Sequence, residues 1–201
     1  MVVIKHLKLG LFVLLLAGCS ALDQRESGSA SWQTHSERLR LLQQWTANGK
    51  IAVRMANAAE SASLIWQQDR QNSSVQLSGP LGMGATTIHS DGQKLEIHQG
   101  DLYRMIDIST PDAILLNTGW DLPLQALSYW LKGVPAPNSK VQRLELDPQT
   151  ELLKSLSQDN WDISYQRYQV FQGFTLPARL QIQRGATHAK IIISRWQTLP
   201  T

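Results

Sequence analysis

Lys50-Ile51-Ala52-Val53-Arg54-Met55 is the stretch that decides the fold, because large apolar residues occupy every second position. A period of two is typical of a β-strand with one buried face. Similar short rows recur along the chain, with one long interruption. The predicted strands are 51–55, 62–66, 75–77, 85–88, 95–97 and 102–108 before the interruption, and 141–146, 161–165, 176–182 and 189–193 after it.

Turn-forming residues separate these rows. They include 69–72 (Asp-Arg-Gln-Asn), 78–80 (Ser-Gly-Pro), Asp91-Gly92 and 99–101 (Gln-Gly-Asp). Short alternating runs joined by such turns indicate an antiparallel meander bent into a barrel or half-barrel. We find no repeat of fixed period and no linker after residue 31. The strands on both sides of the interruption are therefore expected in one sheet of one domain.

Three helices are expected beside the strands. Residues 32–45 carry apolar side chains at helical spacing, and Asn48-Gly49 would end or turn this helix. Thr110-Pro111-Asp112 is a helix start, and that helix would end at Gly119. A further helix would start at Leu122-Pro123. Its apolar stripe is Leu124, Leu127 and Leu131, widened by Ala126 and Trp130, before Gly133 and Pro135 close it. The expected class is mainly β (α+β).

The N-terminus has the features of a secretory signal. Lys5 and Lys8 precede an apolar run over 9–17, which is too short for a stable bilayer anchor. The run ends in Leu16-Ala17-Gly18-Cys19, which looks like a bacterial lipobox, whose cysteine is lipidated and becomes the first mature residue. The alternative is a plain signal with an incidental cysteine. Cys19 is the only cysteine, which favours the lipobox.

Composition limits the function classes. Two of the 19 Lys and Arg lie in residues 1–18, against none of the 16 Asp and Glu, so the formal charge of +3 falls to +1 once residues 1–18 are removed. We therefore expect no nucleic-acid partner. A polar stretch over 20–31 indicates a flexible tether. The expected organisation is a signal peptide at 1–18, a tether at 19–31 and one domain at 32–201.

Catalytic and metal-binding patterns are absent from the sequence. It has no Gly-x-Ser-x-Gly, no phosphate loop, no His-Glu-x-x-His and no Cys-x-x-Cys. His89 and His98 could meet across a hairpin, but two histidines on a sheet face are the simpler interpretation. We expect no enzyme activity, no cofactor and no metal.

Apolar residues carry more information. A sheet curved around Leu- and Trp-rich helices has an apolar interior, which is either a filled core or a pocket for one ligand. The loop 78–84 has three glycines and a proline around Leu81 and Met83. Leu81 either folds back onto the core or points outward, held by Pro80 and Gly82, as a wedge for a membrane or an acyl chain.

A series of motifs resembles the LolB family of outer-membrane lipoprotein receptors. After the lipobox, the matching segments follow in order along nearly all of the remaining chain. They are Trp45 with 49–54 (Gly-Lys-Ile-Ala-Val-Arg), 66–68 (Trp-Gln-Gln), 77–82 (Leu-Ser-Gly-Pro-Leu-Gly), 119–124 (Gly-Trp-Asp-Leu-Pro-Leu), 129–135 (Tyr-Trp-Leu-Lys-Gly-Val-Pro), Pro137, Trp161, Tyr165, Leu176-Pro177 and 190–196. The resemblance says nothing about 57–61 or 141–159.

This resemblance implies a LolA/LolB-like fold, a single-domain incomplete antiparallel β-barrel with a helical lid over a hydrophobic cavity. It implies a lipid-anchored protein of the outer membrane that faces the periplasm. Such a receptor accepts lipoproteins from the periplasmic carrier LolA and inserts them into the membrane without nucleotide hydrolysis. It implies that Leu81 acts in insertion, and Ser20 is compatible with sorting to the outer membrane.

The expected partners are LolA, lipoprotein acyl chains and outer-membrane lipid, with the chain itself a monomer. Alternation and helix stripes suggest which residues line the cavity, although a register error of one residue would invert a strand. These residues are Leu64, Trp66, Leu77, Leu95, Ile97, Leu115, Leu127 and Trp130. Two alternatives stay open, a scaffolding outer-membrane lipoprotein with a filled core and a lipid-modifying enzyme, for which no motif is present.

Overall fold

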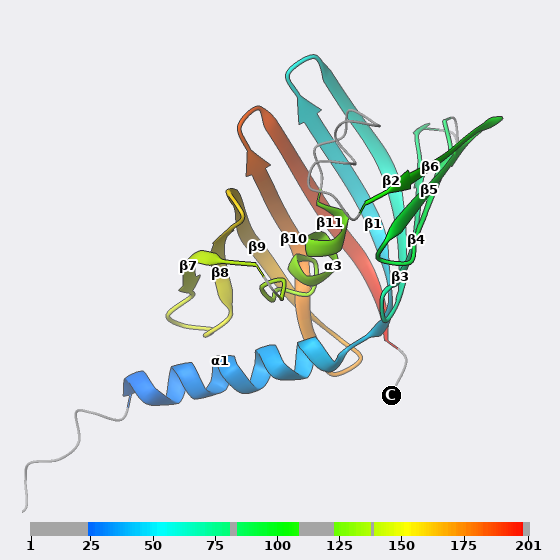
Figure 1. Ribbon diagram of the computed structural model, residues 1–201. Helices are drawn as coiled ribbons and strands as arrows, with labels where there is room; N and C mark the ends of the chain where they lie inside the picture. The colour runs from blue at the N-terminus through cyan, green and yellow to red at the C-terminus, as the bar shows by residue number, and fades with distance from the viewer. Residues whose placement is uncertain (1–23, 81–83, 109–122, 138, 199–201) are drawn as a thin grey trace, which may run out of the picture.

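A single curved antiparallel sheet forms the body of the protein in the computed structural model, which describes residues 24–80, 84–108, 123–137 and 139–198. Among these residues, eleven strands pair in the order β6-β5-β4-β3-β2-β1-β11-β10-β9-β8-β7 (Figure 1). The end strands β6 and β7 are not paired with each other, so the sheet is an incomplete barrel, as predicted. The elements are α1 (Gln24–Leu41), β1 (Gln44–Met55), β2 (Ala58–Asp69), β3 (Asn72–Ser78), β4 (Thr86–Ser90), β5 (Lys94–Gln99), β6 (Leu102–Asp107), α3 (Leu124–Trp130), β7 (Val141–Leu146), β8 (Leu153–Gln158), β9 (Trp161–Phe171), β10 (Phe174–Arg184) and β11 (Thr187–Thr198).

Pairing of β1 with β11 joins the strands before and after α3 into this one sheet. The ladder runs from Trp45 opposite Thr198 to Arg54 opposite His188, with a bulge between Asn48 and Gly49. A Cβ atom on Gly49 would lie 2.0 Å from the carbonyl oxygen of Ile192. Glycine is therefore needed here because the two backbones approach closely.

The first helix differs from its prediction at both ends. It begins at Gln24, inside the predicted tether, and it ends at Leu41 rather than near Trp45. Trp45 lies on β1, and Asn48-Gly49 continues that strand opposite a bulge at Ser194 of β11 rather than ending a helix. The helical prediction failed there because the spacing of Leu39, Leu42 and Trp45 fits a helix, whereas Trp45 and Ala47 alternate into the sheet core.

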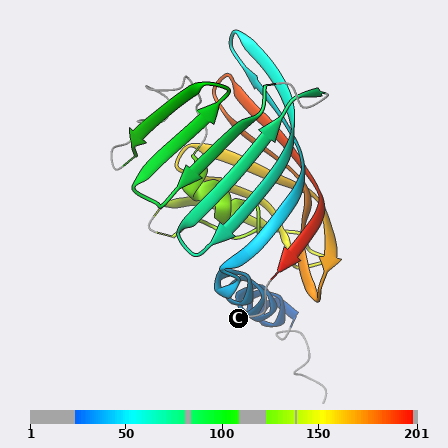
Figure 2. The ribbon, with the colours of Figure 1, turned by 90° about the vertical axis from the view of Figure 1, so that its right-hand side faces the viewer.

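The core lies on the concave face of the sheet, which also holds α3 (Figures 1 and 2). Large side chains from both halves of the sheet meet there, including Trp66 and Leu95 from one half and Trp161 and Ile163 from the other. Trp45 packs between Trp66 and Trp196, with ring centroids 6.0 and 5.1 Å apart. This aromatic contact lies near the centre of the sheet and stabilises the joint between its halves.

Strand β8 was not predicted, and β9 is longer than its predicted segment of 161–165. The sequence of β8, Leu153–Gln158, places its buried residues at Leu153, Leu156 and Gln158, a spacing that does not alternate strictly. No helix in the described ranges is long and apolar enough to cross a bilayer.

Candidate functional site

Helix α3 occupies the inside of the curved sheet, between the strands β2–β5 and the strands β8–β10 (Figure 2). Its prediction from the stripe of Leu124, Leu127 and Leu131 is confirmed, with Leu127 and Trp130 fully buried. Trp130 packs against Trp161 of β9, with ring centroids 6.2 Å apart. The hydroxyl of Tyr165 donates a hydrogen bond of 3.0 Å to the carbonyl oxygen of Trp130, and burial raises the pKa of that hydroxyl.

Gln158, at the end of β8, is the polar centre of this contact and is completely buried. Its side-chain oxygen accepts hydrogen bonds from Trp130 Nε1 at 2.8 Å and from the Ala136 backbone N–H at 2.9 Å. Its amide nitrogen donates to the carbonyl oxygens of Ala136 at 2.9 Å and Ser139 at 3.1 Å. Four hydrogen bonds therefore fix α3 and the segment after it to β8. Sequence reasoning missed this residue, because a glutamine beside a turn gives no sign of burial.

Lys132 forms a second buried contact at the C-terminal end of α3. Its Nζ donates a hydrogen bond of 2.9 Å to the carbonyl oxygen of Leu42, between α1 and β1. The same ammonium lies 5.2 Å from the centre of the Tyr129 ring. Burial lowers the pKa of Lys132 from 10.5 to about 8. This cation connects the interior helix with the start of the sheet.

The other side of α3 is held differently. Gln125 Nε2 donates a hydrogen bond of 2.7 Å to the carbonyl oxygen of Gly92, in the turn between β4 and β5, and this bond is exposed to solvent. Water can replace an exposed hydrogen bond at little cost, whereas a buried group that loses its partner is strongly destabilised. The contact of α3 with the β4–β5 turn is therefore easier to break than its contact with β8 and β9.

The predicted cavity residues gather on the concave face where they lie in the described residues. Leu77 is partly buried and packs against the core, and Leu115 lies outside the described residues. The buried members come from two strands, β2 and β5, and from α3. They are Leu64, Trp66, Leu95, Ile97, Leu127 and Trp130. Their common inward orientation fits the expected register, and their role in holding an acyl chain stays a prediction.

The predicted lipid-facing residues are described only in part. Cys19, Leu81 and Gly82 lie outside the described residues, as does the helix predicted over 110–119. Pro80 is exposed and follows the end of β3. This end of the sheet is the one away from α1, where β1 begins and β11 ends. Assignments of lipidation and of an insertion loop therefore stay predictions.

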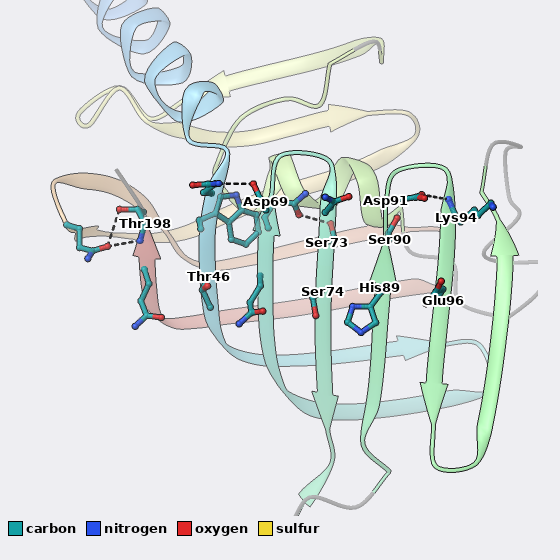
Figure 3. Close-up of a pocket in the computed structure, with 17 residues that line it drawn as sticks. Thr46, Asp69, Ser73, Ser74, His89, Ser90, Asp91, Lys94, Glu96 and Thr198 are labelled. Atoms are coloured by element: carbon teal, nitrogen blue, oxygen red, sulfur yellow. Dashed lines mark hydrogen bonds between the residues drawn. The ribbon is translucent and has the colours of Figure 1, made fainter. Parts of the chain in front are cut away.

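A polar groove of about 860 Å³ crosses the outer face of the sheet near α1 (Figure 3). Five of its residues are directly paired, one after another, across the neighbouring strands β1 to β5. They are Thr46, Gln67, Ser74, His89 and Glu96. The groove contains none of the predicted cavity residues. Apart from Trp45, its lining residues carry amide, hydroxyl, imidazole or charged groups, and it lies on the face opposite to the buried apolar core.

His89 and His98 do meet on this outer face, with ring centroids 6.2 Å apart, and Tyr103 extends the contact. His98 Nε2 lies 3.9 Å from a carboxylate oxygen of Glu96. Within the described ranges, no group of three or more His, Cys, Asp or Glu side chains is arranged to hold a metal ion.

Comparison with known proteins identifies the family. Residues 43–196 match the family model described as "Outer membrane lipoprotein LolB". The chain belongs to the LolB family. An outer-membrane lipoprotein LolB of Stutzerimonas stutzeri (strain A1501) is 35% identical, over 98% of this chain and 97% of the relative. The LolB of Pseudomonas aeruginosa (strain LESB58) is 36% identical over 91% of each chain.

Solved structures agree on the fold of this LolB-family chain. A LolA superfamily protein from Nitrosomonas europaea is similar at a TM-score of 0.51 and 10% identity, over 87% of this chain and 94% of that chain. A DUF1329 family protein from Desulfovibrio piger is similar at a TM-score of 0.56 and 9% identity, over 86% and 92%. The expected LolA/LolB-like fold is confirmed. Membership also assigns the chain to the lipoproteins of the outer membrane, with a role in lipoprotein localisation.

Proposed function

We propose that this chain accepts acylated lipoproteins from the periplasmic carrier LolA and inserts them into the outer membrane without nucleotide hydrolysis. The observation that carries the proposal is the placement of α3. Leu127 and Trp130 of this helix belong to one buried apolar cluster with side chains from both halves of an unclosed sheet. Movement of α3 relative to one half would open an apolar space between them.

The contacts of α3 indicate which side opens. Gln158 and Tyr165 hold the helix to β8 and β9 through buried hydrogen bonds. Gln125 holds it to the β4–β5 turn through an exposed one. An acyl chain would therefore enter between α3 and the strands β2–β5, where Leu64, Leu77, Leu95 and Ile97 would contact it.

Free energy for the transfer comes from apolar contact. Each buried CH₂ of an acyl chain contributes about 0.8 kcal/mol, so a small difference in buried length between carrier and receptor makes the handover favourable. A receptor that buries two more CH₂ groups than the carrier binds the lipoprotein about 15-fold more tightly. No nucleotide is needed for such a step, because the acyl chains move to the state that binds them better.

Transfer can be measured with a form of the chain that lacks residues 1–18 and carries Cys19→Ala. It is mixed with a carrier–lipoprotein complex in the absence of ATP, and the lipoprotein is followed by co-purification. We expect the lipoprotein to move to the LolB-family chain. Retention on the carrier, with circular dichroism showing a folded chain, would refute the proposal and favour a scaffolding role.

Two variants separate acceptance from insertion. Gln125→Ala should accept lipoprotein at least as fast as the unaltered chain, while Gln67→Ala, on the outer face, serves as its matched control. For Leu81→Glu, we expect normal acceptance and a loss of insertion into vesicles, because a carboxylate at this position opposes entry into the lipid. If Leu81→Glu inserts lipoproteins normally, the wedge role of Leu81 is wrong.

A further inference from the structure

The outer face of the central strands is strongly basic. Strands β1, β9, β10 and β11 together contain seven Lys and Arg residues and one acidic residue, Asp162. Five of the seven form a continuous surface, which we call the basic face. It consists of Lys50, Arg54, Arg167, Arg179 and Lys190.

Alternation along each strand places these side chains on the outer face. Lys50 and Arg54 flank Ile51 and Val53 of the concave face, and Lys190 lies between the buried Ala189 and Ile191. On β10, Arg179 lies between the buried Ala178 and Leu180. Lys50, Arg54, Arg167 and Lys190 are exposed, and Arg179 is partly buried.

Strand register brings the five side chains together. Arg167 pairs with Arg179, which pairs with Ile192, which in turn pairs with Lys50. Lys190 of β11 pairs with Ala52 of β1. Its side chain therefore lies beside the middle of the stretch from Lys50 to Arg54 on the neighbouring strand. At about 4.8 Å between strands, three intervals from β9 to β1 give a surface about 14 Å wide.

These charges are not neutralised within the described part of the chain. The salt bridges in that part of the chain involve other residues, and the carboxylate of Asp162 lies 3.9 Å from Arg143, outside the basic face. Glu60 pairs with Val53, whose side chain lies on the concave side. Paired residues point to the same face of a sheet, so the Glu60 carboxylate also lies on the side away from the basic face. The residues after position 18 carry a formal charge of only +1, so the basic face is a local concentration of charge.

We propose that the basic face contacts anionic phospholipid headgroups and so orients the domain on the membrane. Members of this family are outer-membrane lipoproteins, so a bilayer surface lies near the folded domain. Headgroup attraction needs several cations on one surface and no precise partner geometry. A protein partner would need a buried aromatic or apolar anchor, but the basic face offers only the small, exposed Ala52 and the partly buried Ile192 between its cations.

Charge number sets the expected size of the effect. Each Lys or Arg close to an anionic membrane surface strengthens the attraction about fivefold. Arg54→Gln with Lys190→Gln should therefore weaken the attraction about 25-fold. Arg70→Gln with Lys94→Gln is the matched control, because it removes two exposed cations that lie outside the basic face, one in the turn between β2 and β3 and one on β5.

The experiment uses the full chain purified from the membranes of an expressing cell and reconstituted into vesicles. Ser61 is exposed and opposite Ala52 on β1, so Ser61→Cys places a donor dye beside the basic face. The unaltered chain serves as the labelling control for Cys19. Energy transfer to headgroup-labelled lipid is compared between phosphatidylcholine vesicles and vesicles in which a third of the lipid is phosphatidylglycerol.

We expect phosphatidylglycerol to raise energy transfer, and salt at 1 M, where the Debye length is about 3 Å, to abolish the increase. The increase should disappear in Arg54→Gln with Lys190→Gln and persist in the control pair. Equal transfer from both vesicle types, or an unchanged increase in the double variant, would overturn the proposal. The proposal would also be overturned if the double variant kept its response to phosphatidylglycerol but no longer bound a protein partner with an acidic surface. None of these readouts depends on lipoprotein transfer.

Discussion

Replacement of Gln158 by leucine tests whether the buried hydrogen bonds fix α3 to β8. Leucine has a similar volume and matches the apolar surroundings, so Gln158→Leu changes mainly the polar contacts. Three buried groups would lose their partner, the Trp130 indole N–H and the N–H and carbonyl oxygen of Ala136. Trp130 is fully buried and Ala136 is 8% exposed, so water does not reach these groups without movement of the segment.

The structure allows the magnitude to be worked out. A buried polar group left without a partner destabilises the folded state by about 1–3 kcal/mol. Three such groups give at least about 3 kcal/mol, and we expect about 3–6 kcal/mol because part of the segment can relax. That loss is large against the total of about 5–15 kcal/mol that stabilises a typical domain.

Equilibrium unfolding in urea measures this loss, since the free energy of unfolding extrapolates linearly to water. Gln183→Leu, at an exposed position of β10, is the matched control and should change stability by less than about 0.5 kcal/mol. A loss below about 1 kcal/mol in Gln158→Leu, with an unchanged dependence on urea, would refute the reasoning. It would mean that the hydrogen bonds of Gln158 do not hold the helix.

Three further predictions concern stability. Gly49→Ala should destabilise the fold by about 3 kcal/mol in thermal unfolding, because the new Cβ would overlap the Ile192 carbonyl oxygen; an unchanged Tm would contradict the close approach. Tyr165→Phe should cost about 1–2 kcal/mol in urea unfolding through the lost hydrogen bond to Trp130, and a neutral result would show that this bond contributes nothing net. Lys132 has a pKa of about 8 when folded and 10.5 as its ordinary value, so between these pH values the unfolded chain binds a proton that the folded chain does not. Unfolding free energy should therefore rise with pH by up to about 3 kcal/mol relative to Lys132→Met, and a constant difference between the two proteins would contradict this.

Much of the fold was predictable because local patterns carried it. Alternation of apolar residues located ten of the strands, and turn residues such as Asp91-Gly92 separated them. The stripe of Leu124, Leu127 and Leu131 predicted α3. Errors arose where one spacing suits two structures, as at Trp45, or where burial did not alternate, as in β8.

The candidate site was predictable only in its apolar part. Leu64, Trp66 and Leu95 are large apolar residues in alternating rows, so their inward orientation followed from period two. Gln158 and Lys132 are polar residues whose types usually occur at the surface. Their burial depends on partners 19 to 90 residues away in the chain, which no local pattern reports.

By itself, the sequence determined the strand-rich class, the position of α3 and the resemblance to the LolB family. Tertiary structure decided that β1 pairs with β11, that α3 is held on one side by buried hydrogen bonds, and that the basic residues of separate strands share one surface. Each of these depends on contacts between segments far apart in the chain. Local propensities do not specify such contacts, because they form only when the whole apolar interior packs together.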